Sequence, residues 1–200
     1  MGVMEDIPPL SPNPAALDFL LTRRSRPPRT LGGRAPTDTE LRPILEAGLR
    51  VPDHGKLEPW RLIVLQRSAL DRLSTLTKTR GMELGYDAAA IDKKASSFSE
   101  TPLAIAVISS LKPSDRIPNS EQLASVAAVC LSITNAALAS GWGACWLTGW
   151  MASDRPFLSE GLLLLPNETV AGFIHIGEEM KTPPERPRPS LDASVTWMSE

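Results

Sequence analysis

The chain has 200 residues, 42% of them hydrophobic, and a formal net charge of −2. This length suits one domain with a sizeable core, and the dispersed charges argue against a nucleic-acid partner. The first residues lack a basic stretch before an apolar run, which argues against a signal peptide, and no apolar run approaches the length of a membrane span. We therefore expect a soluble, cytoplasmic protein without a membrane partner.

The start of the chain predicts a disordered arm followed by a capped helix. Residues 1–12 are rich in acids and prolines and show no helical period. Asn13 followed by Pro14 is typical of a helix start, with the asparagine as the N-cap. The helix should end near Arg23, because the two prolines at 27–28 cannot continue it.

Periodicity, caps and breakers predict the other elements. Thr37 and Glu40 have the spacing of a capping box and should begin a second helix, which Pro43 either kinks or shifts. The helices and apolar strands alternate loosely, which predicts an α/β or α+β fold around a mostly buried sheet. The remaining elements, in chain order, are a strand at 61–66, helices at 68–81 and 88–98, a buried strand at 103–108, a long helix at 120–140 closed by Gly141, a strand at 144–150, a helix at 155–163, a strand at 170–176 and an extended, proline-rich arm at 182–189.

The loop from Val51 to Trp60 carries the most varied chemistry in the sequence. Its two prolines and its glycine exclude a helix, so it connects the second helix to the first strand. It contains an imidazole at His54, together with an ammonium, carboxylates and an indole. Because binding groups concentrate on loops held between rigid elements, this loop is a candidate site.

Arg23, Arg24 and Ser25 form a second candidate site where the first helix ends. Two guanidinium groups and a hydroxyl could hold a phosphate, since arginine supplies forked donors. The alternative is that cations at a helix C-terminus only complement the helix dipole. From the residues alone both interpretations stand.

Metal and hydrolase chemistry have no support in the sequence. The two histidines, His54 and His175, and the two cysteines, Cys130 and Cys145, have no usual metal-ligand spacing. A lone histidine in a loop is often only solvated, and His175 lies in an apolar strand, where a satisfied core role is expected. No serine occupies a Gly-x-Ser-x-Gly elbow. The isolated cysteines fit a reduced compartment.

The segment from Gly141 to Trp146 invites interpretation as a dinucleotide-binding motif, but that interpretation fails. A tryptophan stands where the third glycine belongs, and the segment follows a helix and opens a strand, which reverses the required order. Its small residues would instead let the backbone approach a flat ligand. The tryptophans could equally belong to the core.

Four segments together resemble the FMN-dependent nitroreductase family, in its short YdjA-like branch. The resemblance spans about residues 14 to 197, nearly the whole chain. The matching motifs are Arg23-Arg24-Ser25, Pro52-Asp53-His54 with Pro59-Trp60-Arg61 after four residues, the Gly-x-Gly-x-x-Trp-x-x-Gly run from Gly141 to Gly149, and the closing strand Gly172–Gly177 with its basic-x-basic tail at Arg186 and Arg188.

The resemblance implies a fold, a cofactor and an activity. The fold would be α+β, a three-layer α-β-α sandwich with a mixed, mostly antiparallel central sheet, in a domain-swapped-type homodimer with flavin sites at the subunit interface. Residues 13–181 would form the single domain and 182–200 its extended C-terminal arm. The activity would pass electrons from NAD(P)H through FMN to a nitroaromatic, quinone or similar small-molecule acceptor by a ping-pong scheme.

The resemblance also assigns residues to the cofactor, with no catalytic side chain and no metal ligand. Arg23, Ser25, Arg186 and Arg188 would hold the phosphate. Arg50 and His54 would reach the edge of a flavin that is held mainly by the other subunit. The full cofactor-binding set is Arg23, Arg24, Ser25, Arg50, His54, Gly143, Trp146, Leu147, Thr148, Arg186 and Arg188.

Two positions depart from the family pattern. Leu147 stands where relatives often carry arginine, and Glu58 stands where they commonly carry glutamine or asparagine before Pro-Trp. These departures leave open a flavin-binding protein without significant turnover. A general α/β binding module is the third alternative.

Overall fold

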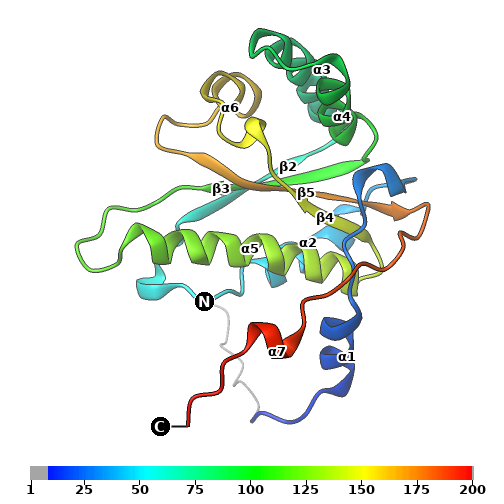
Figure 1. Ribbon diagram of the computed structural model, residues 1–200. Helices are drawn as coiled ribbons and strands as arrows, with labels where there is room; N and C mark the ends of the chain where they lie inside the picture. The colour runs from blue at the N-terminus through cyan, green and yellow to red at the C-terminus, as the bar shows by residue number, and fades with distance from the viewer. Residues whose placement is uncertain (1–8, 200) are drawn as a thin grey trace.

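The computed structural model describes residues 9–199, so the first eight residues of the predicted disordered arm lie outside the described part. The helices and strands of the described part are α1 (Pro14–Thr22), β1 (Leu31–Gly32), α2 (Asp38–Gly48), β2 (Trp60–Leu65), α3 (Arg67–Glu83), α4 (Ala88–Ser99), β3 (Leu103–Ser109), α5 (Asn119–Ala139), β4 (Gly143–Leu147), α6 (Arg155–Leu162), β5 (Thr169–Glu179) and α7 (Leu191–Ser194), with 3-10 turns η1 (Pro28–Thr30), η2 (His54–Lys56) and η3 (Trp150–Ala152) (Figure 1).

The five strands form one sheet with helices on both faces. The strand order is β1-β5-β3-β2, and β4 also pairs with β5. Every strand pairing within residues 9–199 is antiparallel. In Figure 1, α3, α4 and α6 lie on one side of the sheet, and α2 and α5 lie on the other. The predicted α+β fold with three layers and a mostly antiparallel sheet is therefore confirmed.

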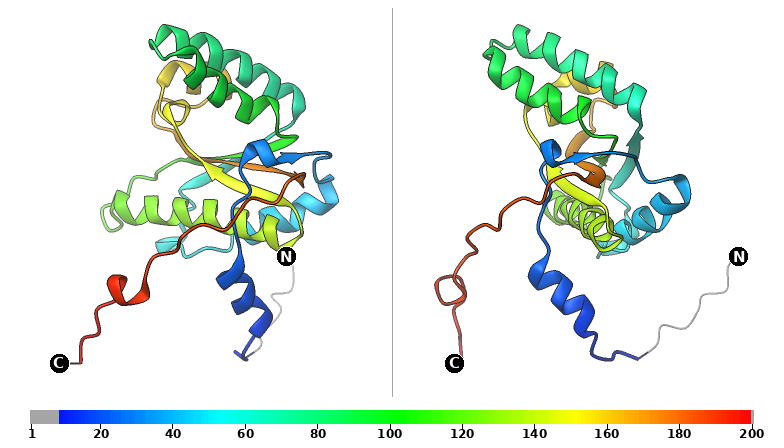
Figure 2. Two further views of the ribbon diagram at one scale, coloured as in Figure 1. Left: turned by 45° about the vertical axis from the view of Figure 1, so that its right-hand side comes forward. Right: turned by 90° about the vertical axis from the view of Figure 1, so that its right-hand side faces the viewer.

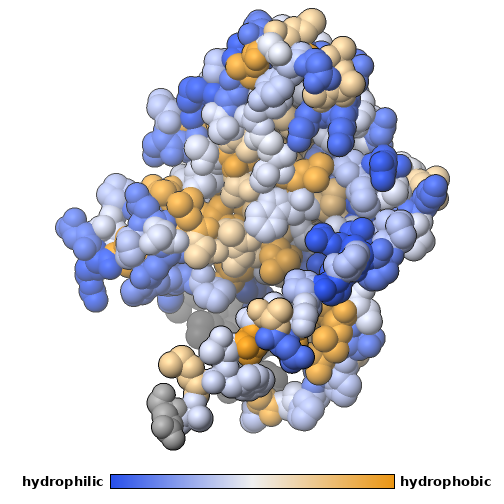
Figure 3. All heavy atoms as spheres, viewed as in Figure 1, coloured by the Kyte–Doolittle hydropathy of each residue, from blue (hydrophilic) through white to orange (hydrophobic). Residues whose placement is uncertain are grey.

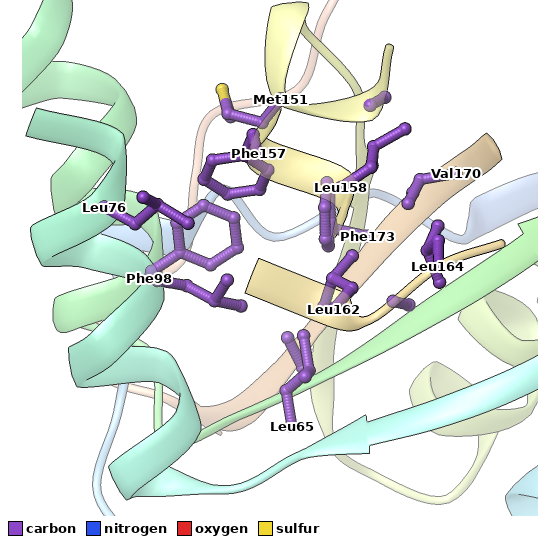
Figure 4. Packing of buried hydrophobic residues seen from close by; sticks show 14 of the residues in the cluster. Leu65, Leu76, Phe98, Met151, Phe157, Leu158, Leu162, Leu164, Val170 and Phe173 are labelled. Atoms are coloured by element: carbon purple, nitrogen blue, oxygen red, sulfur yellow. The ribbon is translucent and has the colours of Figure 1, made fainter. Parts of the chain in front are cut away.

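Strand β3 divides the core into two halves. All seven of its residues are buried, and successive side chains point to opposite faces of the sheet. Ala104, Ala106 and Ile108 join the cluster under α3 and α6, whereas Leu103, Ile105 and Val107 join the cluster under α2 and α5. In the first cluster, Phe98 meets Phe173 edge-on with ring centroids 5.2 Å apart (Figure 4). This two-sided burial explains the continuous apolar run in the sequence.

The predicted helix caps are present. The side chain of Asn13 accepts a hydrogen bond from the Ala16 N–H at 3.1 Å, and Thr37 and Glu40 form a reciprocal capping box. The Glu40 carboxylate also pairs with Arg34, which together with the Thr37 hydrogen bonds lowers the pKa of Glu40 to about 2. Helix α2 begins directly after this cap and continues through Pro43, so the proline does not shift its start.

Two predicted boundaries were wrong. The strand expected at 144–150 ends at Leu147, because Gly149 adopts φ +156° and the η3 turn begins at the next residue. The strand expected at 170–176 continues to Glu179, because its last two residues pair with the short strand β1. Both differences arise from contacts between distant segments, which local periodicity does not contain.

Helix α5 is long and apolar enough to cross a membrane by length and composition, contrary to the sequence expectation. Its inner face packs on the sheet through fully buried residues, among them Val126, Val129 and Ile133. The core helix of a folded domain passes the same test of length and composition. This packing accounts for its apolar character.

A nearly buried ion pair joins β2 to the turn before β5. Arg61 Nε and Nη2 donate to the two carboxylate oxygens of Glu168 at 2.6 and 2.7 Å. Glu168 is 2% exposed, whereas the Arg61 side chain is 42% exposed. The hydrogen bonds from Arg61, assisted by the Leu165 N–H, lower the pKa of Glu168 to about 2 against the opposing effect of burial.

We expect Glu168→Gln to lower the free energy of unfolding at pH 7 by ~2 kcal/mol, because Arg61 loses its charged acceptor. The loss is limited because water still solvates the exposed part of the Arg61 side chain. A carboxyl whose folded pKa is depressed stabilises the protein above its unfolded pKa and loses this contribution as pH falls toward the folded value. The difference from wild type should therefore narrow between about pH 5 and pH 3. Urea unfolding followed by circular dichroism measures it. Glu160→Gln, an exposed control, should change little, and an equal loss for Glu168→Gln at both pH values would contradict the assignment.

Candidate functional site

The segment after α1 is fixed against the start of β4. The Arg26 N–H donates to the Ala144 carbonyl at 2.8 Å, and Arg26 Nε pairs with Glu179 Oε1 at 2.8 Å. Gly143 allows this approach, since a Cβ there would lie 2.4 Å from Leu31 Cδ2 and 3.5 Å from Arg26 Cβ. The first basic motif is thereby held beside the glycine-containing strand.

Four arginines gather at this place: Arg23, Arg24, Arg26 and Arg188. Arg23 Nη2 donates to Ser25 Oγ at 3.1 Å, and Arg188 Nη2 lies 3.4 Å from the Arg23 carbonyl. Burial, together with the charges of Arg188, Arg24 and Arg26, lowers the pKa of Arg23. Guanidinium groups repel one another at such proximity. Arg26 and Arg188 pair with Glu179 and Glu185, which leaves Arg23 and Arg24 without an ion pair among residues 9–199 and able to bind an anion.

Two buried donors in the cluster have no acceptor. Nε of Arg23 and Nε of Arg24 are enclosed and make no hydrogen bond with residues 9–199. Leaving a buried N–H unpaired is costly, so these two donors favour an incoming acceptor. Nε of Arg67 is unpaired as well, but its guanidinium already donates to the Thr101 and Phe98 carbonyls. A phosphate dianion, with several acceptor oxygens, matches the donors of Arg23 and Arg24 in charge and number.

The C-terminal arm contributes unequally to the cluster. Arg188 reaches it and also pairs with Glu185 at 2.8 Å. Arg186 donates its backbone N–H to Glu185, but its guanidinium is exposed and makes no ion pair with any described residue. Glu185 therefore supplies a partial counter-charge beside the arginines.

Strand β4 presents a mainly backbone surface next to the cluster. Gly143 is buried, whereas Trp146 is 37% exposed and Thr148 is exposed. The Trp146 indole N–H donates to the Ala171 carbonyl at 3.2 Å and lies over Gly172, where a Cβ would be only 2.0 Å from Nε1. Leu147 is half-buried and faces the opposite side of the sheet from Trp146. The backbone of β4 from Gly143 to Leu147, the β4 wall, can thus form one flat side of a binding site.

The loop that carries His54 is strained. Gly55, Lys56 and Glu58 all have positive φ, at 71°, 54° and 47°. The Asp53 carboxylate accepts a hydrogen bond from the Glu58 N–H at 2.9 Å and holds the turn closed. Non-glycine residues adopt this conformation at a cost and tend to cluster where function requires them.

The side chain of His54 contacts the first turn of α5. Its Nδ1 is 2.8 Å from Glu121 Oε2, and both side chains are largely exposed. Arg50 is also exposed, at the end of α2. Arg50 and His54 therefore face outward from the chain that carries them.

The loop that carries His54 and the basic segment after α1 lie at opposite ends of α5 (Figures 1 and 2). His54 contacts its first turn, whereas the arginine cluster meets β4 just beyond its last residue. Helix α5 has 21 residues, which at ~1.5 Å per residue separates its ends by roughly 30 Å. One chain therefore does not bring His54 to the arginine cluster, whereas Arg50 lies on the segment that runs beside the middle of α5, between Gly48 at Ile133 and Pro52 at Ser125.

His175 has the core role that the sequence suggested. It is 1% exposed, and its Nδ1 lies 2.9 Å from the Thr101 hydroxyl. Because that hydroxyl donates to the Ser97 carbonyl, it accepts from the imidazole. Burial lowers the pKa of His175 to about 4, which keeps the ring neutral.

Sequence reasoning missed two contributors to the cluster. Arg26, which anchors the loop, belongs to the same basic run as Arg23 and Arg24, so the length of the run was a usable signal. Glu185 had no such signal, because its place beside Arg188 depends on the path of the arm.

Comparisons with known proteins agree with this architecture. The model of the nitroreductase family matches residues 20–178. YdjA of Escherichia coli (strain K12), which carries the name of an NAD(P)H nitroreductase, is 31% identical over 162 residues, covering 81% of this chain and 87% of that protein.

Two solved structures share the fold. A nitroreductase-like family protein from Bacillus cereus has a TM-score of 0.78 at 23% identity, covering 96% of this chain and all of that one. A nitroreductase with bound FMN from Bacteroides fragilis has a TM-score of 0.70 at 20% identity, covering 92% of this chain and 98% of that one. These two show the fold alone, whereas the family match and the identity to YdjA show the family. The chain belongs to the nitroreductase family.

Proposed function

We propose that this protein is an FMN-dependent NAD(P)H oxidoreductase of the nitroreductase type that works as a homodimer in the cytoplasm. The observation that carries the proposal is the arginine cluster beside β4, with two buried donors that lack acceptors. The name of YdjA and the FMN bound by the Bacteroides fragilis structure support the same chemistry.

The residues present fit the phosphate and ring of FMN. Arg23, Arg24, Ser25 and Arg188 would bind the phosphate, and the backbone of β4 with Trp146 would lie along the ring. When bound, FMN supplies the redox chemistry by exchanging electrons with NAD(P)H and with an acceptor. The chain's task is then to hold the cofactor and to leave one open face for both substrates. No side chain is assigned as an acid or base.

A second copy would complete the site. Because His54 lies about a helix length from the arginine cluster, we infer that it serves the cofactor held by the partner copy, together with Arg50 of the same segment. They already face outward, and the Glu121 carboxylate beside His54 keeps the imidazole in place.

Exposed apolar surface supports a dimer independently. Helix α1 has no buried residue and projects from the body of the chain, as does the C-terminal arm (Figure 2). Leu17, Leu20 and Leu21 of α1 are at least 58% exposed, and Trp197 of the arm is 86% exposed. Figure 3 shows further apolar side chains over α5, whose outer face includes Leu123 and Leu131. Such surface is unusual for a monomer and typical of an interface.

The alternative is a flavin-binding protein without significant turnover. It is favoured by Leu147, which supplies no cation at the wall, and by the acid at Glu58. Bleaching of the flavin absorption by NADH or NADPH under anaerobic conditions would exclude it. A yellow protein that neither nucleotide reduces would favour it.

Removing one hydrogen-bond donor to the phosphate should weaken the binding of FMN but not that of riboflavin. Charge-assisted hydrogen bonds are worth about 1.5–3 kcal/mol, so Arg23→Ala should raise the Kd for FMN on the order of 10- to 100-fold. Riboflavin, which lacks the phosphate, should bind almost unchanged, as measured by quenching of flavin fluorescence. Arg29→Ala, an exposed arginine of the next turn, is the control and should leave both affinities unchanged. An equal loss for FMN and riboflavin would place Arg23 away from the phosphate.

Donor and acceptor should take turns at the open face, since the chain has no separate nucleotide-binding motif. Double-reciprocal plots against NAD(P)H at several acceptor concentrations should give parallel lines, as in a ping-pong scheme. Lines that intersect would require both substrates to be bound at once and would refute this arrangement.

Assembly and flavin binding should be lost together. Light scattering should give about twice the 21.7 kDa chain mass. Truncation after Pro189 and the substitution Leu20→Asp should each weaken both the dimer and FMN occupancy, because a ligand that bridges two chains stabilises the pair. Leu165→Asp alters a leucine that is equally exposed, at 60% against 58%, but follows α6 on the other side of the sheet. Leu165→Asp should therefore change neither dimerisation nor FMN occupancy. A monomer with stoichiometric FMN would contradict the proposal.

A further inference from the structure

Lys94 of α4 lies directly against the residue that follows the β4 wall. A Cβ built on Gly149 would be 3.1 Å from Lys94 Nζ and 3.6 Å from Lys94 Cε. With φ at +156°, Gly149 also has a backbone that disfavours any other residue. The glycine thus leaves room for an ammonium group at the end of the strand, next to Thr148.

The Lys94 ammonium has no acceptor of its own. Lys94 is half-buried, yet its ammonium makes no hydrogen bond or ion pair with any residue that the structure describes. The acid nearest to it in sequence on the same helix, Asp92, pairs with Lys78 instead, at 3.8 Å. A half-buried cation without a partner forfeits part of its hydration and gains nothing in return, which makes it available to an incoming anion.

The residue that follows Gly149 belongs to an aromatic pair. Trp150, the neighbour of Gly149, stacks on Tyr86 with ring centroids 5.9 Å apart and an interplanar angle of 17°. Tyr86 is 46% exposed, so the pair is open on one side. The same Cβ on Gly149 would also lie 3.6 Å from Met151 Sδ, which places this thioether near Lys94. Met151 is 3% exposed, so the surface open to a ligand is the aromatic pair. An ammonium against Gly149, one residue from that pair, suits a flat, apolar molecule that carries one negatively charged or polar oxygen group.

We infer that Lys94 binds the oxygen group of an aromatic electron acceptor, a carboxylate or a nitro group, at the open end of β4. The ring of the acceptor lies against the Tyr86–Trp150 pair. Lys94 is therefore a substrate-binding residue that favours anionic aromatic acceptors over neutral ones. This inference rests on the proposed function, because it places the acceptor beside the wall assigned to the flavin.

The test is equilibrium binding of benzoate, which cannot accept the electrons, to the oxidised, FMN-loaded protein. Isothermal titration calorimetry and the flavin difference spectrum should show that benzoate binds more tightly than neutral benzamide. Lys94→Met should raise the Kd for benzoate on the order of 10-fold, because one charge-assisted contact is lost, and should leave the Kd for benzamide unchanged. Lys94→Arg should retain most of the benzoate affinity. Lys93→Met, an exposed lysine one position earlier, should behave as wild type.

The outcomes separate this inference from the proposed function. A yellow protein whose benzoate affinity is unchanged by Lys94→Met would overturn the inference alone. Loss of FMN affinity in Lys94→Met with unchanged benzoate affinity would also overturn it and would make Lys94 a cofactor ligand. A protein that takes up no FMN would contradict both.

Discussion

The hydrogen bond from the Arg26 N–H to the Ala144 carbonyl fixes the basic segment after α1 to the start of strand β4. Gly143 permits that approach, and the ion pair between Arg26 and Glu179 braces it from the neighbouring strand. Without this attachment the guanidinium groups of Arg23 and Arg24 would separate to reduce their repulsion. The proposed anion site thus depends on backbone contacts between segments more than 100 residues apart.

Helix α5 sets the second constraint. Its inner face belongs to the core, so its length holds the His54 loop and the arginine cluster at opposite ends of one chain. A helix of this rigidity cannot fold back to join them. In a dimer with a two-fold axis, the same surface of both copies forms the interface. Such an arrangement would place the His54 end of each helix α5 beside the arginine cluster of the other copy. Assembly and cofactor binding are then one event.

The fold was largely predictable from the sequence, because its strongest signals are local. The caps at Asn13 and Thr37 and the apolar run of β3 needed no tertiary knowledge. The inner and outer faces of α5 were harder to predict from the sequence. Cys130, Thr134 and Ala137 are buried in the core, whereas Leu123 and Leu131 of the same helix are exposed. Small residues carry little periodic contrast, so the inner and outer faces of such a helix look alike. Likewise, the place of Arg188 and the pairing of β1 with β5 follow from chain paths that no local pattern encodes.

The measurement that tests the shared site most directly mixes two defective variants. Arg23→Ala removes a phosphate donor and His54→Ala removes a group at the other end of α5, and each homodimer should bind FMN weakly. After the chains are mixed and allowed to exchange, half of the dimers should be mixed pairs with one intact site each, so about a quarter of all sites should regain wild-type FMN affinity. A mixture that binds no better than its components would show that each chain builds its site alone.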